Sequence, residues 1–511
     1  MFSSVRSMVL HGMKVFEISV ESDIAEGGLP VFDMVGFLGS EVKESKERIR
    51  TSLRNCGFFL PPKRITVNLS PADMRKTGSH FDLPVAISLL VSMGIIPPEF
   101  TEGTIVAGEL SLSGKLKKVN GILPMAMEAK KKGYKRFLLP KENAREGGAV
   151  EGIDVIGVET LNEAAAFLNG EKDIAPCRVD VEELLKARGS DGTDFKEIKG
   201  QRAAKRAIEV AASGMHNIIL TGPPGGGKSL MAKSIPSILP PLTKEECMEI
   251  TGIHSIAGLL GNEGLVTRRP FISPHHTVSR QALSGGGSIP KPGDVSLSHR
   301  GVLFLDELPE FDASTLEILR QPMEDREIHI SRASGNYTYP ADFLLVAAMN
   351  PCKCGYYPDK RCTCSEIAVK KYLSKISRPL LDRIDIVCPV EELSFEDLNK
   401  ETGSEESSGD IRARVSEAFE IQKLRFRDRD LRFNSEMEIG DIREFCALGA
   451  KEEELLKDSF NALNLSARGY HRILRCARTI ADLDHSERIQ CKHLSEAIGY
   501  RPGTGTVFGK V

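Results

Sequence analysis

The clearest chemical pattern in this sequence is a glycine-rich segment followed by lysine and serine. It matches the pattern G-x-x-x-x-G-K-[ST] at every fixed position and reads Gly222, Pro223, Pro224, Gly225, Gly226, Gly227, Lys228 and Ser229. In such loops, backbone N–H groups bind phosphate oxygens, the lysine contacts the β- and γ-phosphates, and the hydroxyl is a ligand of Mg²⁺. A plain glycine-rich turn, the alternative, needs neither Lys228 nor Ser229. We therefore predict a binding site for a nucleoside triphosphate with Mg²⁺.

Two adjacent carboxylates, Asp306 and Glu307, follow the apolar run 302–305. Phosphoryl transfer requires the protein chiefly to position groups and to stabilise charge. We expect Asp306 to hold Mg²⁺ through water and Glu307 to polarise the attacking water. The pair lies about 80 residues after the glycine-rich segment, which leaves room for a helix and a strand within one parallel sheet. The spacing therefore favours hydrolysis of the bound triphosphate.

A polar amide, Asn350, follows a third apolar run at residues 343–349. In one interpretation, Asn350 orients water between the γ-phosphate and Glu307. In the other, it is an ordinary turn-forming residue before Pro351. The residues alone leave both interpretations open.

Four cysteines come next along the chain: Cys352, Cys354, Cys362 and Cys364. In a cytosolic protein, such a dense cluster favours a metal over disulfides, and four sulfur ligands suit tetrahedral Zn²⁺. The Cys-x-Cys spacing is unusual, because most structural zinc sites place two or more residues between paired cysteines. Free buried thiols and a redox-labile loop are the alternatives to a possible Zn²⁺ site.

These motifs need a parallel sheet to bring them together, and the chain divides into segments that can supply it. Short strands bounded by proline or glycine mark the first third, and 3.6-residue periodicity marks the last fifth. The domains that we expect are an α+β domain over 1–172, a linker over 173–193, an α/β core over 194–395, an exposed connection over 396–410, a helical segment over 411–500 and a tail over 501–511.

Length and charge agree with a globular protein that has several domains. The chain has 511 residues, 41% of them hydrophobic, and a formal net charge of −3. Such a charge provides no global attraction to nucleic acid, so any contact with DNA must come from local basic surface. No apolar stretch is long enough to span a membrane, and residues 1–20 carry too many charges for a secretory signal. We expect a cytoplasmic protein without a membrane partner.

Taken together, the motifs resemble an AAA+ ATPase of the magnesium-chelatase-like group, and more narrowly the ComM/YifB family. Further segments that carry the resemblance are 273–277, 285–288, 301–311, 380–385 and 466–470. The resemblance implies ATP as the nucleotide, Arg383 as an arginine finger for a neighbouring subunit, and Arg468 as the sensor-2 arginine of a helical lid. A finger supplied in trans implies a homo-oligomeric ring, and the family's ring is a hexamer.

The first domain resembles the carboxy-terminal domain of Lon proteases, a fold shared with domain 2 of ribosomal protein S5. The resemblance lies in residues 76–79 and 108–114. His80 aligns with the nucleophilic serine of the proteases, and Leu123 aligns with their lysine base. Without that pair there is no activated nucleophile, so we expect a scaffold or binding module that does not cleave peptides.

His275, His276 and the loop 284–294 lie between the glycine-rich segment and Asp306, where this group of ATPases inserts elements that line the ring's pore. Arg280, Lys291 and Arg300 supply nearby cations. The resemblance implies that this region contacts a phosphate backbone without reading its sequence. A solvated loop with locally bonded histidines is the alternative.

Three functional hypotheses follow. The preferred one, implied by the resemblance, is a ring-shaped, ATP-driven DNA motor, a helicase for branch migration on single-stranded or branched DNA during natural transformation. The alternative is a chelatase-type motor for metal insertion, against which the first domain and the cysteine cluster argue. A Lon-like ATP-dependent protease is the third, and His80 and Leu123 argue against it.

Overall fold

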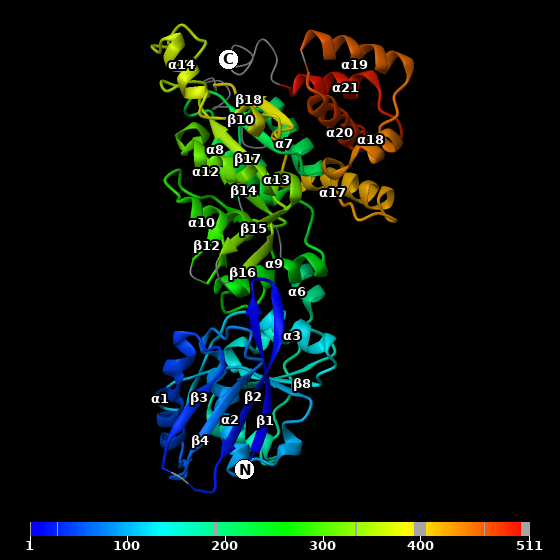
Figure 1. The fold of residues 1–511 in the computed structure, drawn as a ribbon. Helices are drawn as coiled ribbons and strands as arrows, with labels where there is room; N and C mark the ends of the chain where they lie inside the picture. Colours follow the sequence, from blue (N-terminus) through cyan, green and yellow to red (C-terminus); the bar gives the residue numbers. More distant parts are fainter. Residues whose placement is uncertain are drawn as a thin grey trace. The chain divides into compact units, whose positions relative to one another are not determined.

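The chain forms two compact units in a computed structural model (Figure 1). The structure describes residues 2–27, 29–187, 193–287, 289–332, 335–392, 405–463 and 465–501. The first unit combines Met1–Ala187, Thr243–Thr267 and Ser331–Tyr339, and the second combines Arg188–Leu242, Arg268–Ile330 and Pro340–Val511. Each unit has its own sheet and its own apolar core, and each is described by itself.

The first unit contains a mixed seven-stranded sheet in the order β3-β4-β2-β1-β5-β8-β9. Its strands are β1 (Phe2–His11), β2 (Lys14–Ile24), β3 (Phe32–Val35), β4 (Ile65–Ser70), β5 (Thr104–Val106), β8 (Arg136–Pro140) and β9 (Asp154–Val158). β2 pairs antiparallel with β1 and β4, whereas the other neighbours are parallel. In β4, Ile65, Val67 and Leu69 alternate with less buried residues, which is the period-2 pattern of a strand with one buried face.

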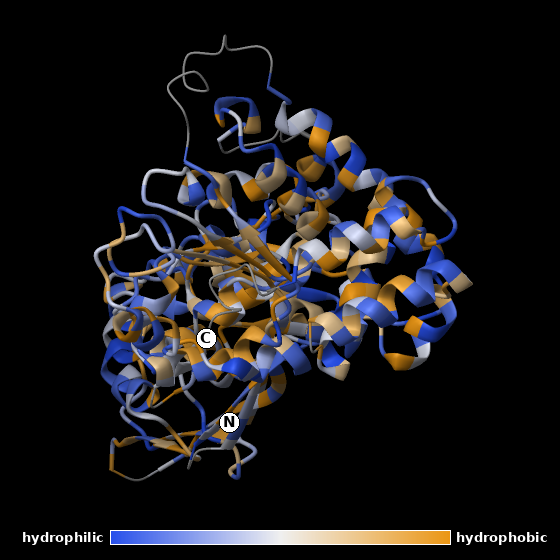
Figure 2. Ribbon diagram, turned by 90° about the horizontal axis from the view of Figure 1, so that it is seen from above, coloured by the Kyte–Doolittle hydropathy of each residue, from blue (hydrophilic) through white to orange (hydrophobic). Residues whose placement is uncertain are grey.

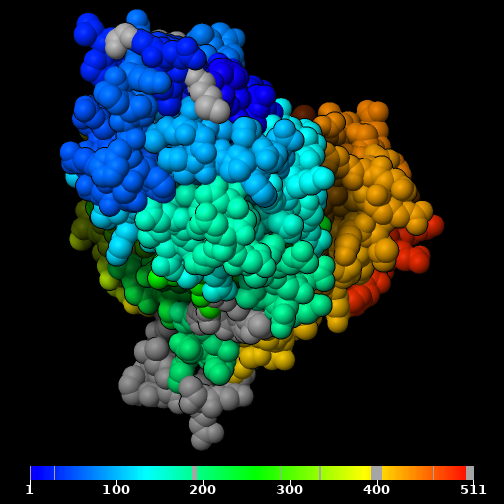
Figure 3. Space-filling view, turned by 90° about the horizontal axis from the view of Figure 1, so that it is seen from below, coloured from blue at the N-terminus to red at the C-terminus, as the bar shows by residue number. Residues whose placement is uncertain are grey.

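Helices cover this sheet and complete the first unit. They are α1 (Ser40–Asn55), α2 (Asp82–Ser92), α3 (Ile122–Lys131), α4 (Ala144–Gly147), α5 (Leu161–Leu168), α6 (Val181–Ala187) and α9 (Lys244–Ala257). Every residue of α2 is buried, because this helix packs on β1 and β2 and also on α1. In Figure 3 the blue and cyan residues of this unit form one continuous surface. Helix α6 lies inside the segment 173–193, where the sequence predicts a linker.

The second unit contains a five-stranded parallel sheet in the order β11-β14-β17-β10-β18. Its strands are β10 (Ile218–Thr221), β11 (Phe271–Ile272), β14 (Val302–Leu305), β17 (Leu344–Met349) and β18 (Ile386–Pro389). The helices near it are α7 (Arg202–Gly214), α8 (Lys228–Ser234), α10 (Arg280–Ser284), α11 (Asp294–Leu297), α12 (Ala313–Leu316), α13 (Pro322–Asp325), α14 (Glu366–Leu373) and α15 (Arg378–Leu381). The predicted α/β fold with a parallel sheet is confirmed.

The last part of the second unit is helical, in agreement with its 3.6-residue periodicity. It consists of α17 (Ser408–Arg425), α18 (Ile439–Phe445), α19 (Ala450–Ala462), α20 (Ala467–Leu483) and α21 (Cys491–Gly499). Helix α17 begins inside the predicted connection 396–410, of which residues 396–404 lie outside the described part of the chain. In the predicted tail 501–511, only Arg501 is described.

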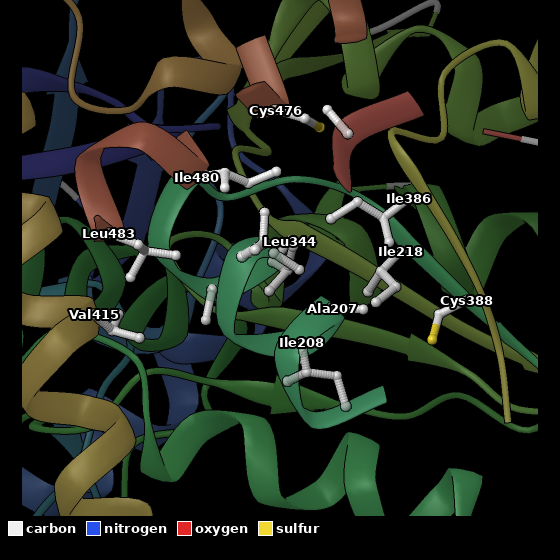
Figure 4. Close-up of a cluster of buried hydrophobic side chains, with 14 of the residues drawn as sticks. Ala207, Ile208, Ile218, Leu344, Ile386, Cys388, Val415, Cys476, Ile480 and Leu483 are labelled. Carbon is white, nitrogen blue, oxygen red and sulfur yellow. The ribbon is translucent and has the colours of Figure 1, made fainter. Parts of the chain in front are cut away.

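One apolar core joins the sheet of the second unit to these helices. Figure 4 shows Ile208 of α7, Ile218 and Leu344 of the sheet, and Val415 and Ile480 of the C-terminal helices in the same cluster. Figure 2 shows hydrophobic colours along the strands and mixed colours on the surface helices. Burying each such side chain contributes about 1.5–3 kcal/mol, so the parallel sheet and the C-terminal helices are stabilised together.

Short elements complete the fold. Three two-stranded sheets are formed by β6 (Glu109–Leu110) with β7 (Leu116–Lys117), β12 (Gly285–Gly286) with β13 (Lys291–Pro292), and β15 (Glu327–Arg332) with β16 (Gly335–Pro340). The 3₁₀ helices are η1 (Ser79–Phe81), η2 (Pro98–Phe100), η3 (Lys141–Asn143), η4 (Phe195–Glu197), η5 (Ile235–Ser237), η6 (Leu308–Glu310), η7 (Glu317–Arg320) and η8 (Asn434–Glu436). The β12–β13 pair occupies the predicted pore loop, whose Ser288 lies outside the described residues.

Candidate nucleotide site

The candidate nucleotide site lies at the carboxyl edge of the parallel sheet in the second unit. β17 lies between β14 and β10. The carboxyl ends of parallel strands meet at one edge, where ligands bind in open α/β folds. The glycine-rich loop follows β10, Asp306 follows β14 and Asn350 follows β17. The sheet order therefore brings together the three motifs that the sequence predicts.

The loop at residues 222–227 has a backbone that requires glycine at several points. Gly225 and Gly227 have φ angles of 81° and 82°, in the left-handed region that side chains disfavour. At Gly222, an added Cβ would lie 2.2 Å from the carbonyl oxygen of Val390. The glycines thus fix a tight path between β10 and α8, as a phosphate-binding loop requires.

Lys228 and Asn350 are in direct contact. Lys228 is 8% exposed, and its Nζ lies 3.1 Å from Asn350 Oδ1. The same ammonium group donates to the carbonyl oxygens of Gly222, at 2.8 Å, and Pro223, at 2.7 Å. Burial lowers the pKa of Lys228, and the nearby Asp306 carboxylate opposes that shift. The contact places Asn350 beside the group predicted to bind the terminal phosphates.

Ser229 and Asp306 supply the oxygen atoms that a magnesium site needs. Ser229 Oγ donates to Asp306 Oδ2 at 2.7 Å. Mg²⁺ binds oxygen ligands and usually keeps several waters, so one hydroxyl and one carboxylate beside a phosphate suit it. The donor set of this chain therefore fits the predicted magnesium ion.

Glu307 is the more exposed of the two carboxylates that follow β14. Its side chain is 59% exposed, its φ angle is 51°, and its backbone N–H donates to Asp306 Oδ1 at 2.9 Å. The imidazole of His276 lies nearby, with Nδ1 3.8 Å from Glu307 Oε2. The sequence did not predict this pairing, because it assigned His276 to a pore contact. The only sequence signal for His276 is its position in the motif 273–277.

The two predicted arginines, Arg383 and Arg468, lie close to one carboxylate. Oε1 of Glu324 lies 2.7 Å from Nη2 of Arg383 and 3.4 Å from Nη2 of Arg468. The Arg383 side chain is 5% exposed and also donates to Pro379 O at 2.7 Å, whereas Arg468 is 58% exposed. The structure thus brings these two arginines together at Glu324 of the same chain.

The four cysteines after Asn350 converge on one point. Their Sγ atoms all lie within 4.8 Å of one another, and the structure shows them as free thiols. Cys352 is buried and the other three are half-buried. Hydrogen bonds from its neighbours, with that from the backbone N–H of Tyr356 the largest, lower the pKa of the Cys354 thiol to about 5. The structure therefore brings together all four predicted ligands of a possible zinc site.

A pocket of about 390 Å³ lies beside the start of the glycine-rich loop. Its lining comes from residues 221–223, from the segment 351–361 that contains part of the cysteine cluster, and from residues 387–392 at and after β18. Tyr356, Tyr357 and Pro389 give it apolar walls, and Glu391 and Arg361 add charge. The loop that carries the cysteines is thus part of the surroundings of the phosphate loop.

Two of the predicted cations near the pore loop differ in their availability. Arg280 is 63% exposed. Arg300, in contrast, is ion-paired with Asp342, and its side chain is only 14% exposed. Arg300 is thus mostly covered and paired within the fold, whereas the sequence predicts it to be one of the cations near the pore loop.

The first unit shows no sign of an activated nucleophile at the positions aligned with the protease pair. His80 is buried, its Nε2 lies 2.8 Å from Met8 O, and burial lowers its pKa to about 4. Leu123 is fully buried in the core. The nearby Ser79 donates to Glu109, and Lys76 is buried with no hydrogen-bond partner for Nζ among the described residues. The protease interpretation gains no support.

The fold and the site define a protein of the magnesium-chelatase class. The family described as magnesium chelatase, subunit ChlI, matches residues 194–398, subunit ChlI of Mg-chelatase matches 20–143, and the ChlI C-terminal family matches 405–501. The chain is 39% identical over 499 residues to the competence protein ComM of Haemophilus influenzae, covering 97% of each chain. It is also 39% identical over 501 residues to the uncharacterized protein YifB of Escherichia coli, covering 98% of this chain and 97% of that one.

A more distant relative is the magnesium-chelatase 67 kDa subunit of Chlorobaculum parvum, 25% identical over 200 residues, or 38% of this chain and 26% of that one. The chain belongs to the ComM/YifB family of magnesium-chelatase-like proteins. Membership of this AAA+ family indicates an ATPase that uses ATP and Mg²⁺. Among the described residues, no helix combines the length and apolar character needed to cross a bilayer.

Proposed function

We propose that this protein is an ATP-driven DNA motor that works as a ring of identical subunits in the cytoplasm. The observation that carries the proposal is the paired geometry of Lys228 with Asn350 and of Ser229 with Asp306 at one sheet edge. The first pair supplies a cation that can bind phosphate and a polar amide beside it. The second pair supplies oxygen ligands for magnesium. The proposed cofactors are ATP and Mg²⁺ for the reaction and Zn²⁺ for the four cysteines after β17.

In the proposed cycle, the phosphate loop and Lys228 bind the triphosphate, and Asp306 and Ser229 hold Mg²⁺. Glu307 polarises the attacking water, which Asn350 orients. Arg383 completes the site of a neighbouring subunit, and Arg468 contacts nucleotide in its own subunit. Such a shared site makes hydrolysis depend on assembly, and a closed hexamer is the arrangement we propose.

The DNA step rests on similarity to the competence protein ComM over 97% of both chains. We assign the motor a role in recombination during natural transformation, as a helicase that drives branch migration on single-stranded or branched DNA. A net charge of −3 provides no global attraction to DNA, so the proposed contact requires local basic surface. Arg280 and Lys291, near the β12–β13 pair, are exposed cations suited to a phosphate backbone.

Hydrolysis measured with and without forked DNA tests this function. We expect DNA to stimulate ATP turnover, Lys228→Ala to lose nucleotide binding, and Glu307→Gln to bind ATP without hydrolysing it. Lys233→Ala and Glu310→Gln change exposed residues close by and are the matched controls. A rate of ATP hydrolysis that is the same with and without every form of DNA would contradict the proposed motor function.

A chelatase-type motor for metal insertion is less well supported, because the magnesium-chelatase 67 kDa subunit of Chlorobaculum parvum is 25% identical over 38% of this chain, whereas the competence protein ComM is 39% identical over 97% of it. The burial of His80 and Leu123 disfavours the protease hypothesis. ATP-dependent cleavage of casein would be evidence for it.

A further inference from the structure

We propose that Cys352, Cys354, Cys362 and Cys364 bind one Zn²⁺, and that this metal holds the segment 351–364 against the phosphate loop so that nucleotide affinity depends on it. The inference deepens the proposed function, since it assigns a metal and a regulatory consequence to the same nucleotide site. It rests on the geometry of the thiols and on the contacts of the segment that carries them.

The distances between the sulfur atoms fit a tetrahedral ion. Sγ of Cys352 lies 3.2 Å from Sγ of Cys354 and 3.7 Å from Sγ of Cys362, and the last two are 3.6 Å apart. With Zn–S bonds of about 2.3 Å, a tetrahedron places its sulfurs about 3.8 Å from one another. A disulfide requires about 2.05 Å. The observed distances therefore match shared ligation of one ion.

The segment between β17 and α14 has few other interactions that could hold its conformation, so a bound metal ion would stabilise it. Residues 351–364 contain turns but no helix or strand. Loops of this length without secondary structure are uncommon in compact domains unless they have a function. Cys352 is buried, but the other three cysteines are half-buried, so apolar burial contributes little. Metal binding supplies stability directly to a segment that has little core of its own.

Three contacts connect this segment to the nucleotide site. Asn350, directly before it, contacts Lys228 Nζ. Gly355 packs so closely on the phosphate loop that an added Cβ would lie 2.5 Å from Pro224 Cδ. Arg361 Nη2 lies 2.8 Å from Glu392 Oε2, beyond β18, and its guanidinium lies 4.6 Å from the ring centroid of Tyr356.

The cysteine-bearing segment and the phosphate loop also line one pocket together. Residues 355–359 and Arg361 line one part of it, and Gly222 and Pro223 line another. If the metal leaves, the segment loses the thiolate anchor that fixes both Asn350 and Gly355. The phosphate loop then loses one of its packing surfaces, and Lys228 loses a positioned amide partner. Weaker binding of nucleotide follows from loss of a preorganised site.

Metal analysis tests the first half of the proposal. The protein is purified without chelators from zinc-supplemented cells, and its zinc content is measured by inductively coupled plasma mass spectrometry. We expect one zinc per chain. Replacement by Co²⁺ should give the visible absorption of tetrahedral cobalt thiolate. The double variant Cys362→Ser with Cys364→Ser should bind no zinc, whereas the control Cys491→Ser, a half-buried cysteine of α21, should keep it. Protein with much less than one zinc and no cobalt spectrum would overturn the site.

Nucleotide binding tests the second half. With a fluorescent ATP analogue, we expect the double variant and chelator-treated wild type to bind about tenfold or more weakly. Zinc should restore the affinity of the treated wild type only. If the double variant fails to fold, as judged by circular dichroism, the treated and restored wild type decide the question. Unchanged affinity without zinc would overturn the coupling. Both measurements omit DNA, so they are independent of the proposed motor activity.

Discussion

Glu324 and Arg383 form an ion pair within one chain, with 2.7 Å between Oε1 and Nη2. The same oxygen lies 3.4 Å from Nη2 of Arg468. Both arginines are thus held on a carboxylate of their own subunit, although the resemblance assigns each of them to a nucleotide. Glu324 lies in the short helix α13, and we expect it to compete with phosphate for both arginines.

Removing the charge of Glu324 should raise the activity of the assembled protein. The Arg383 side chain is only 5% exposed, but it keeps its hydrogen bond to Pro379 O, and the Glu324 carboxylate is 42% exposed and screened by solvent, so the ion pair is worth about 1 kcal/mol. We therefore expect Glu324→Gln to increase the rate of ATP hydrolysis by up to about fivefold. Initial rates measured over a range of protein concentrations test this, with Glu317→Gln, which removes a carboxylate paired with Arg320, as the control. A rate at or below that of the wild type would contradict it.

Arg383→Ala should abolish hydrolysis and leave nucleotide binding largely intact. An arginine that stabilises the transition state from a neighbouring subunit is worth about a thousandfold or more in kcat, but it contributes little to the ground-state complex. Single-turnover kinetics and equilibrium binding are the measurements. The control is Arg378→Ala, an exposed arginine of the short helix α15, which ends just before Arg383. Equal losses of binding and hydrolysis would mean that Arg383 acts within its own subunit.

His276 should act as a positioning residue for Glu307. The two side chains are 3.8 Å apart, and both are partly exposed. We expect His276→Ala to lower kcat by about tenfold and to leave KM unchanged, because the carboxylate loses its orientation while the phosphate loop is intact. His485→Ala is the control, since it removes a largely exposed histidine that lies between α20 and α21. A change in KM alone would contradict this role.

Acid should destabilise the first unit through His80. Burial lowers the pKa of His80 to about 4 from 6.5, so the unfolded chain binds more protons between these values. Its contribution to stability is therefore complete above pH 6.5 and is lost as the pH falls toward 4. Between pH 6.5 and 5 this loss amounts to about 2 kcal/mol.

Urea unfolding at these two pH values tests the prediction. His80→Gln should reduce the difference in unfolding free energy between them. His485→Gln, a change at a largely exposed histidine, should retain the full difference. An unaltered pH dependence in His80→Gln would exclude His80 as its source.

The residues of the candidate nucleotide site were predictable from sequence because each follows an apolar strand of one parallel sheet. Strand type and motif spacing are local signals, and sheet order then places Lys228 beside Asn350 and Ser229 beside Asp306. The roles of these residues stay predictions, as do the domain boundaries. The cysteine cluster was predictable for a different local reason, since its four residues are close along the chain.

Other features depend on the paths of loops, which have no periodic signal. Nothing in the sequence places His276 next to Glu307, or Glu324 between Arg383 and Arg468. The burial of Arg300 against Asp342 depends on the turn before β14 and could not be predicted from composition. Nor does any local pattern join residues 243–267 to the first unit.

Within the first unit, the buried carboxylate of Glu146 accepts hydrogen bonds from Leu123 N, at 2.8 Å, and from Ser255 in helix α9. Cys247 and Leu265, from the same returning segment, belong to its core. A ribosome releases residues in order, so this unit stays incomplete until the chain has been synthesised to residue 339. The glycine-rich loop and β10 leave the ribosome before residue 339. They can join a complete parallel sheet only after β17 and β18 have been synthesised. The two units therefore finish folding during overlapping stretches of translation.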